Sequence, residues 1–139
     1  FTCCDGVVDV SPLVGCAALR NLKFLGCRGV SDVSALAGCV ALHALELNEC
    51  DGVTDVLALG VCATLHTLKL YSCREITDVS ALGGHATLHT LILHYTNVTD
   101  VSSLAGCTSL HTLNLSDSYR LTDVSGLAGC AALHTLSLS

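Results

Sequence analysis

The stretch LHTLKLYSCREITDVSALGGHAT (residues 65–87) contains two kinds of local pattern. Its first part, LHTLKL, ends in alternating apolar and polar residues, which predicts a short, half-buried strand. Farther on, Asp78 precedes a short apolar run, and a carboxylate there can accept hydrogen bonds from the N–H groups two and three residues on. This arrangement predicts the start of a helix or helical turn. Gly84 then lets the chain turn back.

The same phrase recurs along the whole chain. Successive units are 23 residues apart, except that Leu88 and Leu110 are 22 apart, and the opening leucines are Leu19, Leu42, Leu65, Leu88, Leu110 and Leu133. Phe1 falls in register with Phe24, so a partial unit precedes the first complete one. The shared pattern is L-x-x-L-x-L-x-x-C-x-x-[VI]-T-D-V-S-x-L-A-G-C-x-x. A fixed period of this length is typical of solenoid proteins.

This pattern resembles the leucine-rich repeat family over essentially the whole chain. Residues 50–55 (CDGVTD) and 73–78 (CREITD) are similar to the cysteine-containing repeats of F-box adaptors, and residues 98–104 (VTDVSSL) to the repeats of internalins and phosphatase-regulating proteins. The resemblance implies an α/β leucine-rich repeat solenoid. A curved parallel β-sheet lines its concave side, and short helices or helical turns line its convex side.

One strand and one helical turn cannot bury their own leucines. Stacking on neighbouring units buries them, at about 1.5–3 kcal/mol for each side chain. We therefore expect residues 1–139 to form a single domain of about six repeats. Because both ends fall within repeats, we expect the chain to be a fragment of a longer array, flanked by further repeats or domains.

The composition narrows the classes of partner. A formal net charge of −6 argues against a nucleic-acid partner. No apolar run reaches the roughly 18–20 residues of a membrane span, so we expect no membrane association. Ten cysteines without disulfide-type spacing favour a reducing, cytoplasmic location.

Cysteine and aspartate each form columns in the repeat. One cysteine column follows the strand and the other follows the helical turn: Cys4, Cys27, Cys50 and Cys73, then Cys16, Cys39, Cys62, Cys107 and Cys130. A thiol metal site or disulfides are alternatives, but identical inward positions suit small buried thiols better. Cys3 alone stands outside the columns, and we expect it to be exposed. The aspartates (Asp9, Asp32, Asp55, Asp78, Asp100 and Asp123) are interpreted as helix caps rather than as a calcium-binding or catalytic array.

A histidine follows every opening leucine but the first, at His43, His66, His89, His111 and His134, and Arg20 takes the first place. Neighbouring strands lie about 4.8 Å apart, so five imidazoles should run in a row where the strands begin. Zinc binding or proton sensing is conceivable, since neutral imidazole is a common ligand. Simple duplication, with each ring covering its neighbour's leucine, is the favoured interpretation.

The positions that vary between otherwise constant columns are candidates for partner binding. We expect them on the concave face, with Tyr71 and Tyr95 at the centre of a patch that mixes aromatic anchors and charge. The candidate residues are Lys23, Glu46, Asn48, Glu49, Lys69, Tyr71, Ile92, His94, Tyr95, Asn114 and Asp117. An ordinary solvated face without a partner is the alternative.

No catalytic motif is present: the sequence has neither a phosphate-binding glycine loop nor a nucleophile elbow. We therefore expect no catalytic residue, no metal site and no cofactor. The predicted function is non-catalytic recognition of a protein partner, as an adaptor or scaffold. A structural subunit of a large intracellular assembly is the alternative, and an internalin-like surface adhesin ranks last because of the ten thiols.

Overall fold

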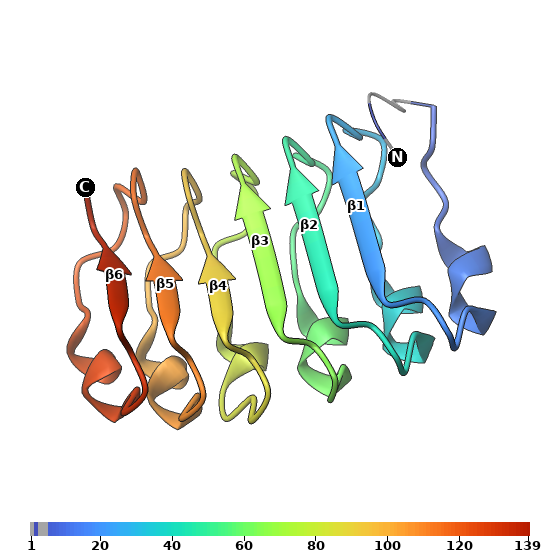
Figure 1. Ribbon diagram of the computed structural model, residues 1–139. Helices are drawn as coiled ribbons and strands as arrows, with labels where there is room; N and C mark the ends of the chain where they lie inside the picture. The colour runs from blue at the N-terminus through green and yellow to red at the C-terminus, as the bar shows by residue number, and fades with distance from the viewer. Residues whose placement is uncertain (1, 3–5) are drawn as a thin grey trace.

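The structure, a computed structural model, describes Thr2 and residues 6–139; Phe1, Cys3 and Cys4 lie outside the described residues. Strands and short 3₁₀ helices alternate along the chain (Figure 1). The strands are β1 (Asn21–Leu25), β2 (Ala44–Asn48), β3 (Thr67–Tyr71), β4 (Thr90–Ile92), β5 (Thr112–Asn114) and β6 (Thr135–Ser137). The 3₁₀ helices are η1 (Ser11–Gly15), η2 (Ser34–Gly38), η3 (Leu57–Val61), η4 (Ser80–Leu82), η5 (Ser102–Gly106) and η6 (Ser125–Gly129).

The six strands form one parallel sheet in chain order, from β1 to β6. Figure 1 shows them side by side, with the helical turns in a second row. Equivalent repeat positions pair across the sheet: Leu45 lies opposite Leu68, and Thr67 lies opposite Thr90. Each rung, meaning one strand with its helical turn, therefore meets side chains from the same repeat positions in the next rung. The predicted solenoid of parallel sheet and helical turns is confirmed.

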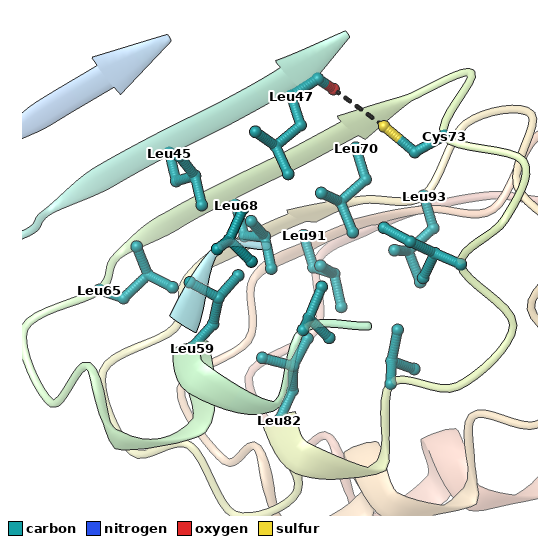
Figure 2. Close-up of a cluster of buried hydrophobic side chains, with 14 of the residues drawn as sticks. Leu45, Leu47, Leu59, Leu65, Leu68, Leu70, Cys73, Leu82, Leu91 and Leu93 are labelled. Atoms are coloured by element: carbon teal, nitrogen blue, oxygen red, sulfur yellow. Dashed lines mark hydrogen bonds between the residues drawn. The ribbon is translucent and has the colours of Figure 1, made fainter. Parts of the chain in front are cut away.

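The core lies between the sheet and the helical turns. In the rung of β3, the side chains of Leu65, Leu68, Leu70, Cys73, Ile76, Val79 and Leu82 are 0% exposed. Figure 2 shows leucines of β2, β3 and β4 pointing toward Leu59 and Leu82 of the helical turns. In β6, by contrast, Leu136 is 42% and Leu138 is 53% exposed. The same columns are buried only where rungs pack on both sides.

Every rung uses an aspartate to begin its helical turn. The Oδ1 atom accepts the N–H of the residue two positions on, at 2.7 Å from Asp78 to Ser80 and at 2.6 Å from Asp100 to Ser102. The predicted capping role is confirmed, but the position differs by one. A valine, such as Val79, occupies the N-cap, and the aspartate precedes it. Hydrogen bonds from Ser34, first from its N–H and then from its hydroxyl, lower the pKa of Asp32.

The cysteine columns join neighbouring rungs. Cys73 Sγ donates to the Leu47 carbonyl oxygen at 3.5 Å (Figure 2), and Cys107 Sγ donates to the Leu82 carbonyl oxygen at 3.1 Å. Burial raises the pKa of the Cys73 thiol to about 12. All eight cysteines from Cys16 onward are free thiols, and seven of them are buried. The predicted small, inward-facing thiols are confirmed for these described cysteines.

The rung of η4 departs from the others. There His85 takes the place of a cysteine, is only 7% exposed, and has an Nε2 atom without a hydrogen-bond partner. The helix shortens from five residues to three, and Gly84 adopts φ +72°, which a side chain would disfavour. The sequence predicted that glycine at the position of Gly84 lets the chain turn back, but Gly129, at the equivalent position, has a different role. A Cβ there would meet the Ala105 carbonyl oxygen at 2.4 Å, so this glycine allows close packing of helical turns.

A row of left-handed backbone follows the strands. Four residues other than glycine adopt positive φ at the same repeat position: Glu49, Ser72, Tyr95 and Asp117, with φ between 52° and 58°. Gly26 occupies this position in the first rung with φ 61°. Left-handed backbone costs a residue with a Cβ about 1–2 kcal/mol, so these four side chains are kept at a cost in stability.

Replacing Leu68 by alanine should lower the free energy of unfolding by about 2–5 kcal/mol, because its fully buried side chain would leave a cavity between three rungs. Urea denaturation followed by circular dichroism measures this loss. Leu57→Ser is the control, since Leu57 is 67% exposed and the equivalent residue in the next rung is Ser80. A loss below about 1 kcal/mol for Leu68→Ala would contradict the stacking account.

Replacing Ser72 by glycine should raise the free energy of unfolding by about 0.5–1 kcal/mol, because glycine adopts φ 54° without strain. The same denaturation assay measures the gain. Ser72→Ala serves as the control, because it removes the hydroxyl but keeps the left-handed strain. Equal gains from both substitutions would show that the hydroxyl, and not the backbone, limits stability.

Candidate functional site

The sheet presents one row of outward side chains along its middle. Lys23, Glu46, Lys69, Ile92 and Asn114 lie next to one another in register across β1 to β5. Lys23 Nζ and Glu46 Oε1 form an ion pair of 2.8 Å. Within the described residues, no carboxylate oxygen lies within 4.0 Å of Lys69 Nζ. The row therefore carries one paired and one unpaired ammonium group.

Two of these residues contribute less exposed surface than the sequence suggested. Ile92 is only 8% exposed. Asn114 Oδ1 accepts the N–H of Ser116 at 2.8 Å, so this amide also holds the turn after β5. The more exposed part of the row is consequently formed by β1 to β3.

A second row begins where the strands end. Asn48 lies opposite Tyr71, and the Tyr71 ring lies 6.0 Å from that of His94 at a tilt of 52°. His94 Nε2 lies 3.3 Å from Asp117 Oδ2. This row joins concave side chains of β2 and β3 to the turn after β5.

Tyr95 belongs to a different cluster from Tyr71. Its ring lies 6.2 Å from that of Tyr119 in an edge-on arrangement, and the Arg74 guanidinium carbon lies 4.5 Å from its centroid. Tyr119 Oη donates to Asp117 Oδ1 at 2.6 Å, and this hydrogen bond raises the pKa of Tyr119. These side chains surround a hollow of about 120 Å³. The expected single patch is in fact two clusters, which share Asp117.

Sequence reasoning missed four residues at this edge: Arg28, Arg74, Asn97 and Tyr119. Arg28 Nη2 lies 4.0 Å from Glu49 Oε2, and Asn97 Nδ2 donates to the Arg74 carbonyl oxygen at 2.8 Å. Each of the four directly follows a member of the first cysteine column or its Thr or Ser substitute. The variation at that position was the signal that could have found them.

The histidines form the expected row. Centroids of neighbouring rings lie 4.4, 4.1, 4.9 and 5.2 Å apart from His43 to His134, with interplanar angles of 21° or less. His89 Nδ1 lies 2.8 Å from the Thr87 carbonyl oxygen, and His111 Nδ1 lies 2.6 Å from that of Ser109. These contacts indicate that Nδ1 carries the proton and that Nε2 faces outward.

The geometry of the histidine row bears on zinc binding and proton sensing, the two functional roles considered for it. No group of three or more histidine, cysteine, aspartate or glutamate side chains in the described part of the chain is arranged to hold a metal ion. Desolvation, followed by the charges of His89 and His43, lowers the pKa of His66. Protonation of His66 is therefore disfavoured in the folded chain.

The row should make the fold sensitive to acid. Because the pKa of His66 is lower in the folded chain than the ordinary 6.5, the unfolded chain takes up its proton first. The contribution of His66 to stability should be fully present well above pH 6.5 and should be lost as the pH falls below it. The Tm should therefore be lower at pH 5.5 than at pH 7.5.

The matched variant is His66→Thr, which removes a ring that stacks on a histidine on either side while a polar side chain stays in its place. It should show a smaller drop in Tm over the same interval. A Tm that is equal at the two pH values in the unsubstituted protein would contradict the role of the row in acid sensitivity.

None of the helices in residues 2 and 6–139 has the length and apolar character of a membrane-spanning segment.

Comparison with known proteins gives matches to a repeat family and to solved structures. The family model described as "Leucine Rich repeats (2 copies)" matches residues 86–129. No curated protein sequence matches the chain significantly.

Two solved structures from Listeria monocytogenes are similar to the chain. The internalin inlF is 31% identical with a TM-score of 0.84, over 93% of this chain and 37% of that one. The internalin C2 (inlC2) is 28% identical with a TM-score of 0.68, over 95% of this chain and 66% of that one. The chain thus spans between about a third and two thirds of these internalins.

Leucine-rich repeat proteins generally mediate protein–protein interactions and are typically non-catalytic. The 23-residue period, the parallel sheet with one 3₁₀ helix per rung, the family match and the likeness to two internalins all agree. This chain is a leucine-rich repeat protein.

Proposed function

We propose that this chain is a non-catalytic module that binds a protein partner through its concave face, as an adaptor or scaffold. The observation that carries the proposal is the contrast between constant and varied positions. Leucines, valines and thiols repeat from rung to rung, whereas the outward row changes from Lys23 through Glu46 and Lys69 to Ile92 and Asn114. Packing does not require that variety.

The chemistry of the varied positions suits a protein surface. Tyr71 and Tyr95 are half-buried, so each keeps one part of its ring in contact with the fold and one part open. Tyrosine and arginine are enriched among residues that dominate interface energies, and Arg74 stacks on Tyr95. The turns that hold Tyr95, after β4, and Asp117, after β5, have left-handed backbone. Side chains kept there despite the strain point to a role outside the fold.

The cellular location of the module bears on whether it is an adaptor, an assembly subunit or an adhesin. Eight free thiols, seven of them buried, support a reducing intracellular location. An adaptor or scaffold is our first choice, and a structural subunit of a large assembly is the alternative. A role as a surface adhesin ranked last on the sequence pattern. The likeness to the internalin inlF over 93% of the chain favours that role more than the sequence did.

The proposal is tested by affinity capture from native lysate, read by mass spectrometry. The concave variant carries Lys69→Ala, Tyr71→Ala, Ile92→Ala and Tyr95→Ala. The control variant carries Val40→Ala, Leu57→Ser and Val61→Gly, which replaces exposed apolar residues of the convex side by the residues of neighbouring rungs. Circular dichroism establishes that both are folded.

A protein captured by the unsubstituted chain should be lost with the concave variant and kept with the control, because truncating central aromatic anchors typically costs about 2 kcal/mol or more each. Loss with the convex variant alone would move the binding site to the helical turns. Retention by both variants would contradict recognition through either face.

A further inference from the structure

A hollow of about 210 Å³ lies on the concave side over β1 to β3. One of the residues that line it departs from the repeat. Ala44 stands where Asn21 and Thr67 stand in the neighbouring rungs, and where threonine stands in all later ones. The smaller side chain leaves a space that the repeat otherwise fills.

The floor of the hollow is apolar and its walls are charged. The floor consists of the Ala44 methyl group and the backbone of Leu22 and Leu45, whose side chains point into the core and are 7% and 1% exposed. Lys23, Glu46 and Lys69 border it, in register on three adjacent strands. An apolar floor of this kind favours a side chain with an aliphatic stem over a hydrated ion.

The walls have a net positive charge on an acidic chain. Two ammonium groups border the hollow against one carboxylate, whereas the whole chain carries −6. Glu46 is already paired with Lys23 at 2.8 Å. Lys69 lies next to Glu46 in register but has no carboxylate within 4.0 Å in the described residues. The unsatisfied charge of the site is therefore that of Lys69.

We propose that this hollow receives an acidic side chain from an extended segment of the protein partner. The aliphatic stem would lie on the Ala44 methyl group, and the carboxylate would pair with Lys69 Nζ. The inference rests on the proposed function and specifies the partner: a segment with a glutamate or aspartate at the position that meets β2.

The repeat itself supplies substitutions that should fold. Ala44→Thr fills the hollow with the residue found at this position in β3, and Lys69→Ile installs the residue found at the equivalent position in β4. Ser137→Ile is the matched control, because it adds isoleucine to the same row outside the hollow and outside the candidate binding residues. Thermal melts of all three establish that the fold is kept.

The probe is a displayed library of random peptides, selected on the immobilised unsubstituted protein. Enriched peptides should carry a shared glutamate or aspartate beside apolar residues. Ala44→Thr and Lys69→Ile should each weaken the best peptide by about tenfold to a hundredfold, the usual effect of losing a charge-assisted contact. Replacing the shared Glu by Gln in the peptide should weaken it similarly, and Ser137→Ile should leave the affinity unchanged. Added salt should also weaken binding.

The other outcomes separate this inference from the proposed function. Peptides that lack a shared acidic residue, or that bind Ala44→Thr and Lys69→Ile as tightly as the unsubstituted protein, overturn the acidic-segment inference. The proposed function then stands if those peptides are lost with the concave variant. If no peptide is enriched, the acidic-segment inference is also overturned, and the capture experiment alone decides the proposed function.

Discussion

A rung of this protein buries its leucines only against the rungs on either side, and most other features follow from that constraint. The core is a line of side chains from equivalent positions, and the same columns that are fully buried in β3 are about half exposed in β6. Because each rung meets nearly the same neighbours, each position is under the same packing requirement in every unit. The sequence repeats because this packing requirement is the same in every unit.

The polar and thiol columns satisfy backbone groups that stacking would otherwise leave unpaired. Asp78 and its equivalents bond the first N–H of each helical turn, and Cys107 and its equivalents bond a carbonyl of the rung before. In the outward row of the sheet, Glu46, Lys69 and Ile92 make no such side-chain bond among the described residues, whereas Asn114 does. The inward columns therefore form the scaffold, and the outward residues form the candidate binding surface. The hollow over Ala44 is part of that surface.

The fold could be predicted almost completely from the sequence, because a periodic core leaves a periodic pattern. The finer errors have local causes. The position of Asp78 was one residue off because a 3₁₀ turn begins later than an α-helix cap would suggest. The site was harder: the sequence predicted Tyr71 and Tyr95 in one patch, but the left-handed turn at Tyr95 directs its ring toward Arg74 and Tyr119. The pairing of Lys23 with Glu46, which leaves Lys69 alone, depends on side-chain geometry that no spacing reveals.

The irregular rung around His85 has a consequence for how the chain assembles. Nearly identical rungs can dock one unit out of place during folding, and misassembly is a characteristic failure of repeat proteins. The unit of residues 65–87 has this buried imidazole. The next unit, which is one residue short, has a Thr96 hydroxyl 3.3 Å from that of Ser118, a contact that a thiol column would not offer. A neighbour shifted by one unit would lose that buried contact, so the irregular units tolerate a shift in register less well than the regular ones.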